Sequence, residues 1–146
     1  MARLPLEGIR VVDSTYVIAM PYACGMMADL GADVIKIEGP AHSDTTRYGQ
    51  TGSYPDNDPG EDPWNRSGNF TQINRGKRSL TLDLSQEEGR EVLKDLLKVA
   101  DVFVENYTPR VMRRWGLDYP NLKKIKPDII MLSNTGYGHG EGPYST

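Results

Sequence analysis

The sequence predicts an α/β domain with a mostly parallel sheet and helices on both faces. Short apolar runs of strand length recur along the chain, and longer segments with helical patterns separate them. Runs that are rich in β-branched residues and lack a polar face are typical of strands covered on both sides, as in parallel sheets. The alternation of the two kinds of segment therefore indicates an α/β layer with right-handed crossovers. The 146 residues are enough for one domain with a buried core.

Five apolar runs are predicted to be the strands of this sheet. They span residues 9–12, 34–37, 80–84, 102–104 and 129–132. Longer segments separate these runs, so consecutive strands are expected to be joined by crossovers and not by tight hairpins.

Helices are predicted between these runs. In residues 19–32, Ala, Met and Leu favour a helix, Pro21 suits its first turn and Gly31 can close it. Residues 109–115 are expected to form a shorter helix that begins with a proline and stops before a glycine. Residues 121–126 are a further candidate.

Residues 85–100 are predicted to form a longer helix. Ser85 followed by Glu88 fits a capping box, in which the two side chains satisfy free N–H groups of the first turn. An apolar stripe at helical spacing follows, formed by Val92, Leu93, Leu96, Leu97 and Ala100.

Composition argues against several classes of protein. Lysine and arginine number 17 against 20 aspartate and glutamate, a net charge of −3, whereas nucleic-acid binders need surplus cations. The single cysteine, Cys24, excludes an intrachain disulfide framework and indicates the reducing cytoplasm. The start of the sequence lacks a long apolar stretch, and no apolar run nears the ~20 residues of a membrane helix. Neither a secretory signal nor a membrane span is expected.

The loops after the predicted strands are candidate ligand sites, because loops at the carboxyl ends of parallel strands build such sites. The last run leads into SNTGYGHGEGPY, with Gly136, Gly138, Gly140 and Gly142. This is neither a Walker loop nor a dinucleotide fingerprint. The glycines have two interpretations: they allow the backbone to approach a ligand closely, or they simply form a flexible loop. Residues 14–15 stand at another strand–helix turn, where an anion would be favoured, although an ordinary turn is the simpler interpretation.

The fourth run leads into ENYTPRVMRRW. Asn106 is expected at the carboxyl end of the strand, Tyr107 offers a flat face, and Arg110, Arg113 and Arg114 follow on a helix. Aromatic faces with arginines can hold an adenine and its phosphates. A solvated basic helix face explains the same residues equally well.

The segment INRGKRSLTLDL has the densest charge in the chain. Arg75, Lys77 and Arg78 surround Gly76 directly before a predicted strand. A phosphate site, a nucleic-acid patch and a plain solvated turn would all have this pattern, and the net charge of −3 argues against nucleic acid.

Other polar and sulfur-containing residues are expected to be structural. His42 and His139 lack carboxylate partners at metal or triad spacing, so no metal is expected. Cys24 is expected in the core, because a reactive thiol needs exposure and a lowered pKa. The methionines of the same helix are expected to fill the core as well, and they are Met20, Met26 and Met27.

Residues 51–65 break the α/β pattern. The stretch TGSYPDNDPGEDPWN holds four acids, three prolines and two glycines. It is predicted to be a solvated acidic loop, with a lid over a site as the alternative. Just before it, Asp44 and Arg47 are expected to pair locally.

The order of these segments resembles the amino-terminal part of the class III CoA-transferases, the family of formyl-CoA transferase and carnitine CoA-transferase. The resemblance rests on PLEGIRVVDST, MADLGADVIKIEGP, DTTR, INRGKRSLTLDLSQEEGREVL, ADVFVENYTPRVMRRWGLDY and PDIIMLSNTGYGHGEGPY, in this order. It covers essentially the whole chain, and NRGKRS and VENYTP at their usual separation make it specific. It implies that residues 1–146 are an incomplete, Rossmann-like large domain. The small domain and the carboxyl-terminal return of the family are expected outside this sequence.

The resemblance implies a cytoplasmic enzyme that moves coenzyme A from an acyl-CoA to a carboxylic acid acceptor, without nucleic acid or a membrane as partner. In the family an aspartate attacks the thioester and passes through a mixed anhydride to an enzyme–CoA thioester. That aspartate is expected beyond residue 146, since Asp13, Asp33 and Asp101 match positions that are not catalytic. The chain is therefore expected to be inactive alone. It would belong to a longer enzyme that forms an interlocked homodimer, or be a non-catalytic subunit of a heteromeric transferase.

The resemblance also implies which residues contact CoA. They are Ile18, Ala19, Leu82, Leu84, Ser85, Asn106, Tyr107, Thr108 and Arg114. Gly39 replaces an arginine of the family and Ser85 a lysine, so two basic contacts are missing. Tyr16 and Ile18 stand where formyl-CoA transferase has a histidine and a glutamine. The cations of residues 75–78 are then expected to shape the turn before the strand or to lie near the phosphates of CoA.

Overall fold

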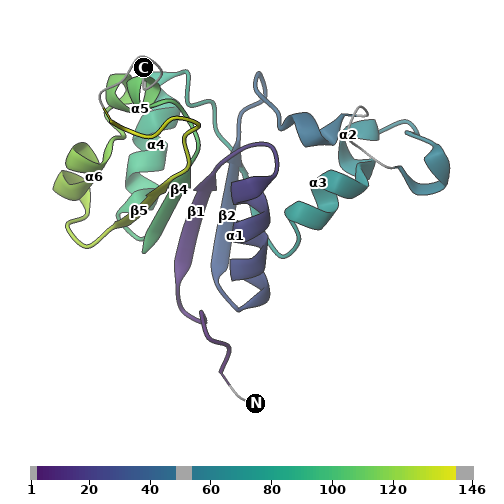
Figure 1. Cartoon of the computed structure of the whole chain (residues 1–146), viewed down its shortest axis with the longest axis horizontal. Coiled ribbons are helices and arrows are strands. Elements are labelled where there is room, and N and C mark those ends of the chain that lie inside the picture. Colours follow the sequence, from purple (N-terminus) through teal and green to yellow (C-terminus); the bar gives the residue numbers. More distant parts are fainter. Residues whose placement is uncertain (1–2, 49–53, 141–146) are drawn as a thin grey trace.

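The computed structural model describes residues 3–48 and 54–140, which form a five-stranded parallel sheet (Figure 1). The strands lie in the order β3-β2-β1-β4-β5. Their bounds are Arg10–Ser14 for β1, Asp33–Glu38 for β2, Arg78–Thr81 for β3, Val102–Glu105 for β4 and Ile130–Ser133 for β5. The predicted α/β fold with a parallel sheet is confirmed. The same strand order occurs in doubly wound sheets, whose ligands bind beyond the carboxyl ends of the strands.

The central strand β1 brings together parts of the chain that are far apart in the sequence. Val12 pairs with Ile35 of β2 on one side and with Phe103 of β4 on the other. Because all pairs are parallel, Ser14 at the end of β1 lies beside Glu105 at the end of β4. The loops that follow the strands therefore meet at one edge of the sheet.

Helices cover both faces of the sheet, as predicted. On one face α1 (Ala19–Asp29) buries Cys24 against Val11 and Val34. On the other face lie α4 (Glu87–Leu97), α5 (Pro109–Trp115) and α6 (Tyr119–Ile125), packed around Phe103. In the described ranges, no helix has the length and apolar character that crossing a bilayer requires.

The helix ends follow the predicted local signals. Gly31 has a φ of +99°, just after α1, and Gly116 has a φ of +65° at the end of α5. Glycine adopts these left-handed conformations without the steric cost that a side chain adds. Pro109 is the first residue of α5, where a missing N–H costs nothing.

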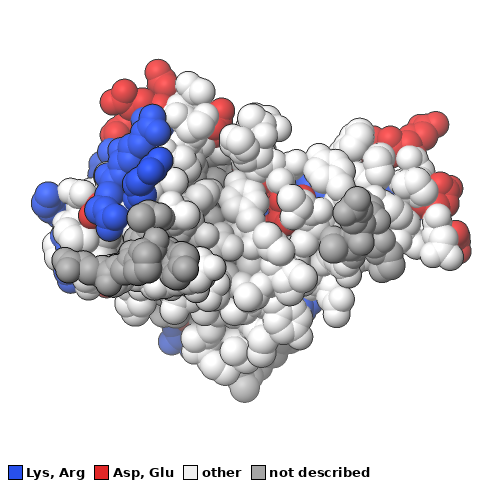
Figure 2. Space-filling view, turned by 45° about the horizontal axis from the view of Figure 1, so that its top comes forward, with Lys and Arg blue, Asp and Glu red and all other residues white. Residues whose placement is uncertain are grey.

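The segment between β2 and β3 projects to one side of the sheet (Figure 1). It holds two single turns of 3-10 helix, Thr45–Arg47 and Pro55–Asn57, followed by α2 (Pro63–Arg66) and α3 (Gly68–Ile73). Residues 51–53 of the predicted acidic loop lie outside the described residues. Residues 54–62 are mostly exposed, and acidic side chains gather at the tip of this projection (Figure 2).

The prediction for residues 80–85 was wrong in two respects. β3 ends at Thr81, and α4 begins at Glu87 after Gln86, so Ser85 does not cap the helix. The carboxylate of Asp83 accepts hydrogen bonds from the N–H of Ser85 at 2.9 Å and from its Oγ at 2.7 Å. Such a local turn competes with both strand and helix pairing.

Two apolar residues that were expected in the core are half exposed. Met26 is 49 % exposed on the outer side of α1, and Val92 is 49 % exposed on α4. Met20 and Leu93, on the same two helices, are buried as predicted. The buried stripe of each helix is therefore narrower than the apolar composition suggested.

Candidate ligand-binding site

A pocket of about 420 Å³ lies beyond the carboxyl ends of the strands. We call it the Tyr107 pocket. It is lined by Tyr16, Val17, Gly39, His42, Ser43, Thr45, Leu82, Asp83, Leu84, Ser85, Tyr107, Val111 and Trp115. These residues come from the loops after β1, β2 and β3, from the end of β4 and from one side of α5.

Three aromatic rings form a continuous wall of the Tyr107 pocket. The ring of Tyr107 meets that of Tyr16 edge-on, with centroids 6.0 Å apart, and that of Trp115 in the same manner at 5.1 Å. Leu82 and Leu84 add an aliphatic surface. Aromatic pairs of this geometry contribute about 0.5–1.5 kcal/mol beyond the burial of their area. The arrangement suits a flat, uncharged ligand group.

The ionisable groups of the Tyr107 pocket provide no strong cation. Its lining includes no lysine or arginine among the described residues, and Asp83 supplies a carboxylate. Hydrogen bonds from Ser85 lower the pKa of the Asp83 carboxyl and keep it charged. Burial raises the pKa of Tyr16 and Tyr107, so both phenols stay neutral. A phosphate group would therefore be better placed outside this pocket than within it.

Four of the nine residues with an implied ligand contact line the Tyr107 pocket: Leu82, Leu84, Ser85 and Tyr107. Asn106 and Thr108 line a smaller hollow that adjoins it through Tyr107 and includes residues 135–138 of the glycine-rich segment. Gly142 lies outside the described residues. The structure thus brings two of the predicted strand-end segments together.

Ile18, Ala19 and Arg114 do not line these two hollows. Ile18 is 55 % exposed and directly precedes α1. Arg114 is exposed on α5, as are Arg110 and Arg113, and none of the three has an ion-pair partner among the described residues. Figure 2 shows cationic side chains gathered on the side of the molecule where α5 lies.

Gly39 is buried where its loop passes the segment after β3. A Cβ atom at this position would lie 3.2 Å from the carbonyl oxygen of Leu82 and 3.6 Å from the Cα of Asp83. A larger side chain here would push the two segments apart, which gives a packing reason for glycine at this place.

The cations of residues 75–78 are each paired with an aspartate from another element. Lys77 donates to Asp13 at 2.7 Å, with both side chains almost fully buried. Arg75 pairs with Asp29 of α1, and Arg78 with Asp33 at the start of β2. These residues therefore fix the turn before β3 and do not line the Tyr107 pocket.

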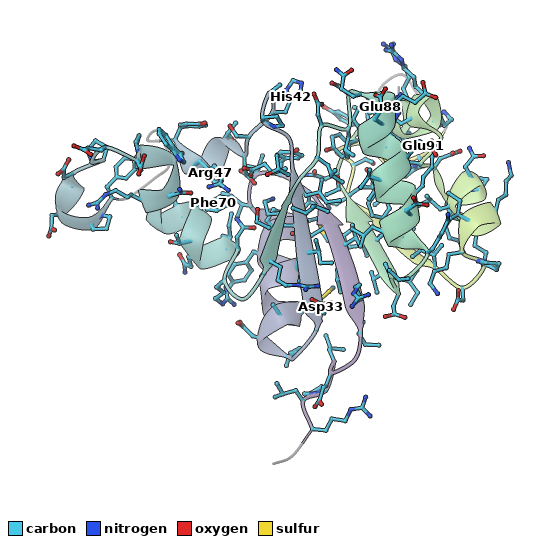
Figure 3. All side chains as sticks on the ribbon, turned by 180° about the vertical axis from the view of Figure 1, so that it is seen from behind. Asp33, His42, Arg47, Phe70, Glu88 and Glu91 are labelled. Carbon is cyan, nitrogen blue, oxygen red and sulfur yellow. The ribbon has the colours of Figure 1, made fainter. Side chains whose placement is uncertain are left out.

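The expected local pair of Asp44 and Arg47 was wrong. Arg47 donates to Glu38 at 2.7 Å, and its guanidinium lies 3.6 Å from the centre of the Phe70 ring (Figure 3). Asp44 is fully buried and pairs with Lys36. Lys36 is more deeply buried than Arg47, so it has the greater need of the fully buried Asp44 carboxylate, which explains the exchange of partners.

Several pocket residues were missed by reasoning from the sequence. Thr45 and Ser43 reach the pocket because the loop after β2 folds back at Asp44. Val111 lies four residues before Trp115 on one side of α5, and this helical spacing was a usable signal. No group of three or more potential metal ligands occurs within residues 3–48 and 54–140.

An open parallel sheet with an aromatic-walled pocket at the carboxyl ends of its strands is typical of α/β domains that bind small ligands. The sequence narrows this class further, because residues 6–146 match the profile of CoA-transferase family III. The chain belongs to this family.

Curated relatives and solved structures agree with this assignment. The chain is 43 % identical over 145 residues to a formyl-CoA:oxalate CoA-transferase of Streptomyces coelicolor, covering 99 % of this chain and 32 % of that protein. It is 41 % identical over 143 residues to the β subunit of a succinyl-CoA–L-malate CoA-transferase of Chloroflexus aurantiacus, covering 97 % and 32 %. The crystal structure of a CAIB/BAIF family protein from Brucella suis superposes with a TM-score of 0.81 at 41 % identity, covering 99 % and 36 %. The chain thus spans about a third of the length of these proteins.

Proposed function

We propose that this chain is the amino-terminal, CoA-binding portion of an acyl-CoA:carboxylate CoA-transferase. The observation that carries the proposal is the convergence of implied CoA contacts on one pocket. Leu82, Leu84 and Ser85 follow β3, whereas Tyr107 follows β4, yet all four line the Tyr107 pocket. Membership of CoA-transferase family III supplies the ligand class.

The chemistry of the Tyr107 pocket suits the uncharged parts of CoA. The rings of Tyr107 and Trp115 and the leucine surface can pack against adenine or the pantetheine arm. The phosphates would lie outside, where Arg114 offers a guanidinium that has no acidic partner among the described residues. Arginine binds phosphate through paired N–H groups.

The proposed reaction uses an aspartate beyond residue 146. Its carboxylate attacks the acyl-CoA carbonyl carbon, and CoA thiolate leaves to give an acyl–aspartyl anhydride. The thiolate then attacks the aspartyl carbonyl, which releases the donor acid and leaves an aspartyl–CoA thioester. The acceptor carboxylate reverses these two steps and departs as the new acyl-CoA. No step consumes ATP, because each exchanges one acyl bond for another.

In this proposal the chain alone is inactive. Residues 1–146 are the amino-terminal part of the large domain, and the rest of the longer polypeptide supplies the small domain and the returning segment. The complete enzyme would be an interlocked homodimer in the cytoplasm. The partial coverage of the relatives, 32 %, supports the longer polypeptide. The single cysteine, buried and free, is compatible with a reducing compartment.

A second candidate is a non-catalytic subunit of a heteromeric CoA-transferase. One relative at 41 % identity is named a β subunit, which favours a heteromer. Gly39 and Ser85, which replace basic family residues, would also fit a subunit with weakened CoA binding. Purification of the natural protein under native conditions separates the two: one long chain supports the homodimer, and a stable second chain supports the heteromer.

CoA binding is tested by calorimetry on the longest natural polypeptide that contains this chain. We expect Arg114→Ala to weaken CoA binding by about tenfold or more, because a hydrogen bond to a charged group contributes roughly 1.5–3 kcal/mol. Arg78→Ala is the matched control, since Arg78 pairs with Asp33 at the opposite edge of the sheet. No binding by the unmodified protein, or an equal effect of both substitutions, would overturn the proposed site.

The covalent step has its own readout. Incubation of the longest natural polypeptide with an acyl-CoA should add the mass of CoA less one water to an aspartate beyond residue 146. Hydroxylamine should remove the adduct, because it cleaves thioesters. Complete absence of an adduct with a panel of acyl-CoAs would contradict the transferase reaction but leave CoA binding intact.

A further inference from the structure

The turn between β1 and α1, residues 15–17, has its backbone polar groups held by side chains from other segments. The N–H of Thr15 donates to Asp13 at 3.0 Å, and the carbonyl of Thr15 accepts from Lys36 Nζ at 2.6 Å. Asn106 holds both sides of Tyr16: its Oδ1 accepts from the N–H at 3.1 Å and its Nδ2 donates to the carbonyl at 2.9 Å. The turn is thereby tied to β2 and to the end of β4.

The last donor of the turn, the N–H of Val17, is held by Asp44. The fully buried Oδ1 of Asp44 lies 3.3 Å from this N–H and also accepts from the N–H and hydroxyl of Thr46 at 3.0 and 2.8 Å. Its Oδ2 faces Lys36 Nζ at 3.3 Å. One carboxylate therefore joins the loop after β1 to the loop after β2, and both loops line the Tyr107 pocket.

Val17 occupies a conformation that its side chain disfavours. Its φ is +74°, in the left-handed region, where a β-branched residue is a strained outlier that persists only where its surroundings hold it. Val17 is also 48 % exposed and lines the Tyr107 pocket, so packing alone does not fix it. Its backbone N–H is held by the hydrogen bond to Asp44.

We propose that Asp44 is a positioning residue that keeps Val17 in its strained conformation and so shapes the wall of the Tyr107 pocket for its ligand. The proposal rests on the proposed function for the identity of that ligand, CoA. Without the carboxylate, Val17 would relax toward negative φ. The start of α1 and the ring of Tyr16 would then shift away from the ligand.

The decisive experiment compares Asp44→Ala with the double variant Asp44→Ala/Val17→Gly in the longest natural polypeptide that contains this chain. Glycine adopts positive φ about as readily as negative φ, so it does not need the carboxylate. We expect Asp44→Ala to weaken CoA binding by about tenfold, which corresponds to 1.4 kcal/mol. Adding Val17→Gly should restore the affinity to within roughly threefold. Thermal stability should stay low in both variants, because Lys36 remains buried without its partner.

Two controls separate positioning from general damage. Asp33→Ala removes a carboxylate that pairs with two arginines at the far edge of the sheet, and it should leave CoA affinity unchanged. Asp44→Asn, which keeps an oxygen acceptor, serves as the milder variant if Asp44→Ala does not fold. Its smaller loss of affinity should likewise be rescued by Val17→Gly.

Hydrogen exchange of a peptide covering residues 15–20 gives a readout that needs no ligand. Substitution of Asp44 should speed exchange in this peptide more than in the rest of the sheet. If the unmodified protein binds no CoA, the proposed function fails. Faster hydrogen exchange of residues 15–20 in the Asp44 variants would still show that Asp44 holds the turn. If CoA binds and the Asp44 variants bind equally well, or Val17→Gly gives no rescue, the positioning role is wrong.

Discussion

Removal of the Lys77 ammonium is expected to destabilise the protein more than removal of either arginine of the same turn, Arg75 or Arg78. Lys77 Nζ donates three hydrogen bonds, each 2.7 Å long: to Asp13, to the carbonyl of Pro21 and to Asn74. The side chains of Lys77 and Asp13 are 1 % and 0 % exposed. In Lys77→Met the Asp13 carboxylate would stay buried without a countercharge.

The size of the effect follows from this burial. Breaking a buried ion pair by removing one partner costs about 3–5 kcal/mol, because the remaining charge is left unpaired in a low-dielectric interior. Whole domains have stabilities of roughly 5–15 kcal/mol. Arg78→Met provides the contrast: the Arg78 side chain is 63 % exposed, and exposed pairs contribute about 0–1 kcal/mol.

Urea unfolding followed by tryptophan fluorescence measures both variants, since Trp115 packs against Tyr107 and reports the folded state. The double variant Asp13→Asn/Lys77→Met should recover much of the loss, because it removes both charges and keeps an oxygen acceptor for Thr15. A loss below about 1 kcal/mol in Lys77→Met would refute the reasoning. A double variant no more stable than the single one would refute it as well.

Three further predictions concern single groups. Burial raises the pKa of the Cys24 thiol to about 12. The neutral thiol contributes its full stabilisation below the pKa of the thiol in the unfolded state, about 8.5. Above that pH, the free energy of unfolding should fall by up to about 1.4 kcal/mol per pH unit relative to Cys24→Ala, measured by urea unfolding. Ser85 is exposed at the rim of the Tyr107 pocket, so Ser85→Lys should add a cation that can reach phosphates outside the pocket. CoA binding should become stronger in a salt-dependent manner, measured by calorimetry at two ionic strengths. Glu105→Gln should change stability by less than about 1 kcal/mol in thermal unfolding, because the buried Oε1 of Glu105 has no donor among the described residues.

Each of these predictions has a contrary outcome. Parallel pH profiles of the unmodified protein and Cys24→Ala would show that burial does not control the thiol. Unchanged or salt-independent affinity in Ser85→Lys would place the phosphates of the ligand away from Ser85. A loss above about 2 kcal/mol in Glu105→Gln would indicate that a group outside the described residues donates to Glu105.

The elements of the fold could be predicted where their signals are local. Pro109 and Gly116 bound α5 as expected, because a missing N–H and a left-handed φ are properties of single residues. The prediction of a capping box at Ser85 was wrong for an equally local reason, because the Ser85 hydroxyl donates its hydrogen bond to Asp83 and not to the helix. Local rules of similar strength competed there, and the sequence does not show which one prevails.

The polar network could not be predicted, because its partners are distant in the sequence. Lys77 and Asp13 are 64 residues apart, and no periodic pattern links them. Asp44 and Arg47 are close in the sequence, but burial of Lys36 decides which of the two partners Asp44 takes. The Tyr107 pocket was partly predicted through a family resemblance, whereas Thr45 and Ser43 depend on how one loop folds back.

The outer strand β5 is expected to promote association between copies of the isolated chain in solution. Ile130 and Leu132 are 61 % and 41 % exposed, and in Figure 1 no helix stands in front of β5 as α1 stands in front of β2. Within the described ranges, no sixth strand pairs with its free side. An uncovered apolar strand is a template for association between copies. Light scattering of the isolated 146-residue chain should therefore rise with concentration, and a charged residue in place of Ile130 should suppress that rise.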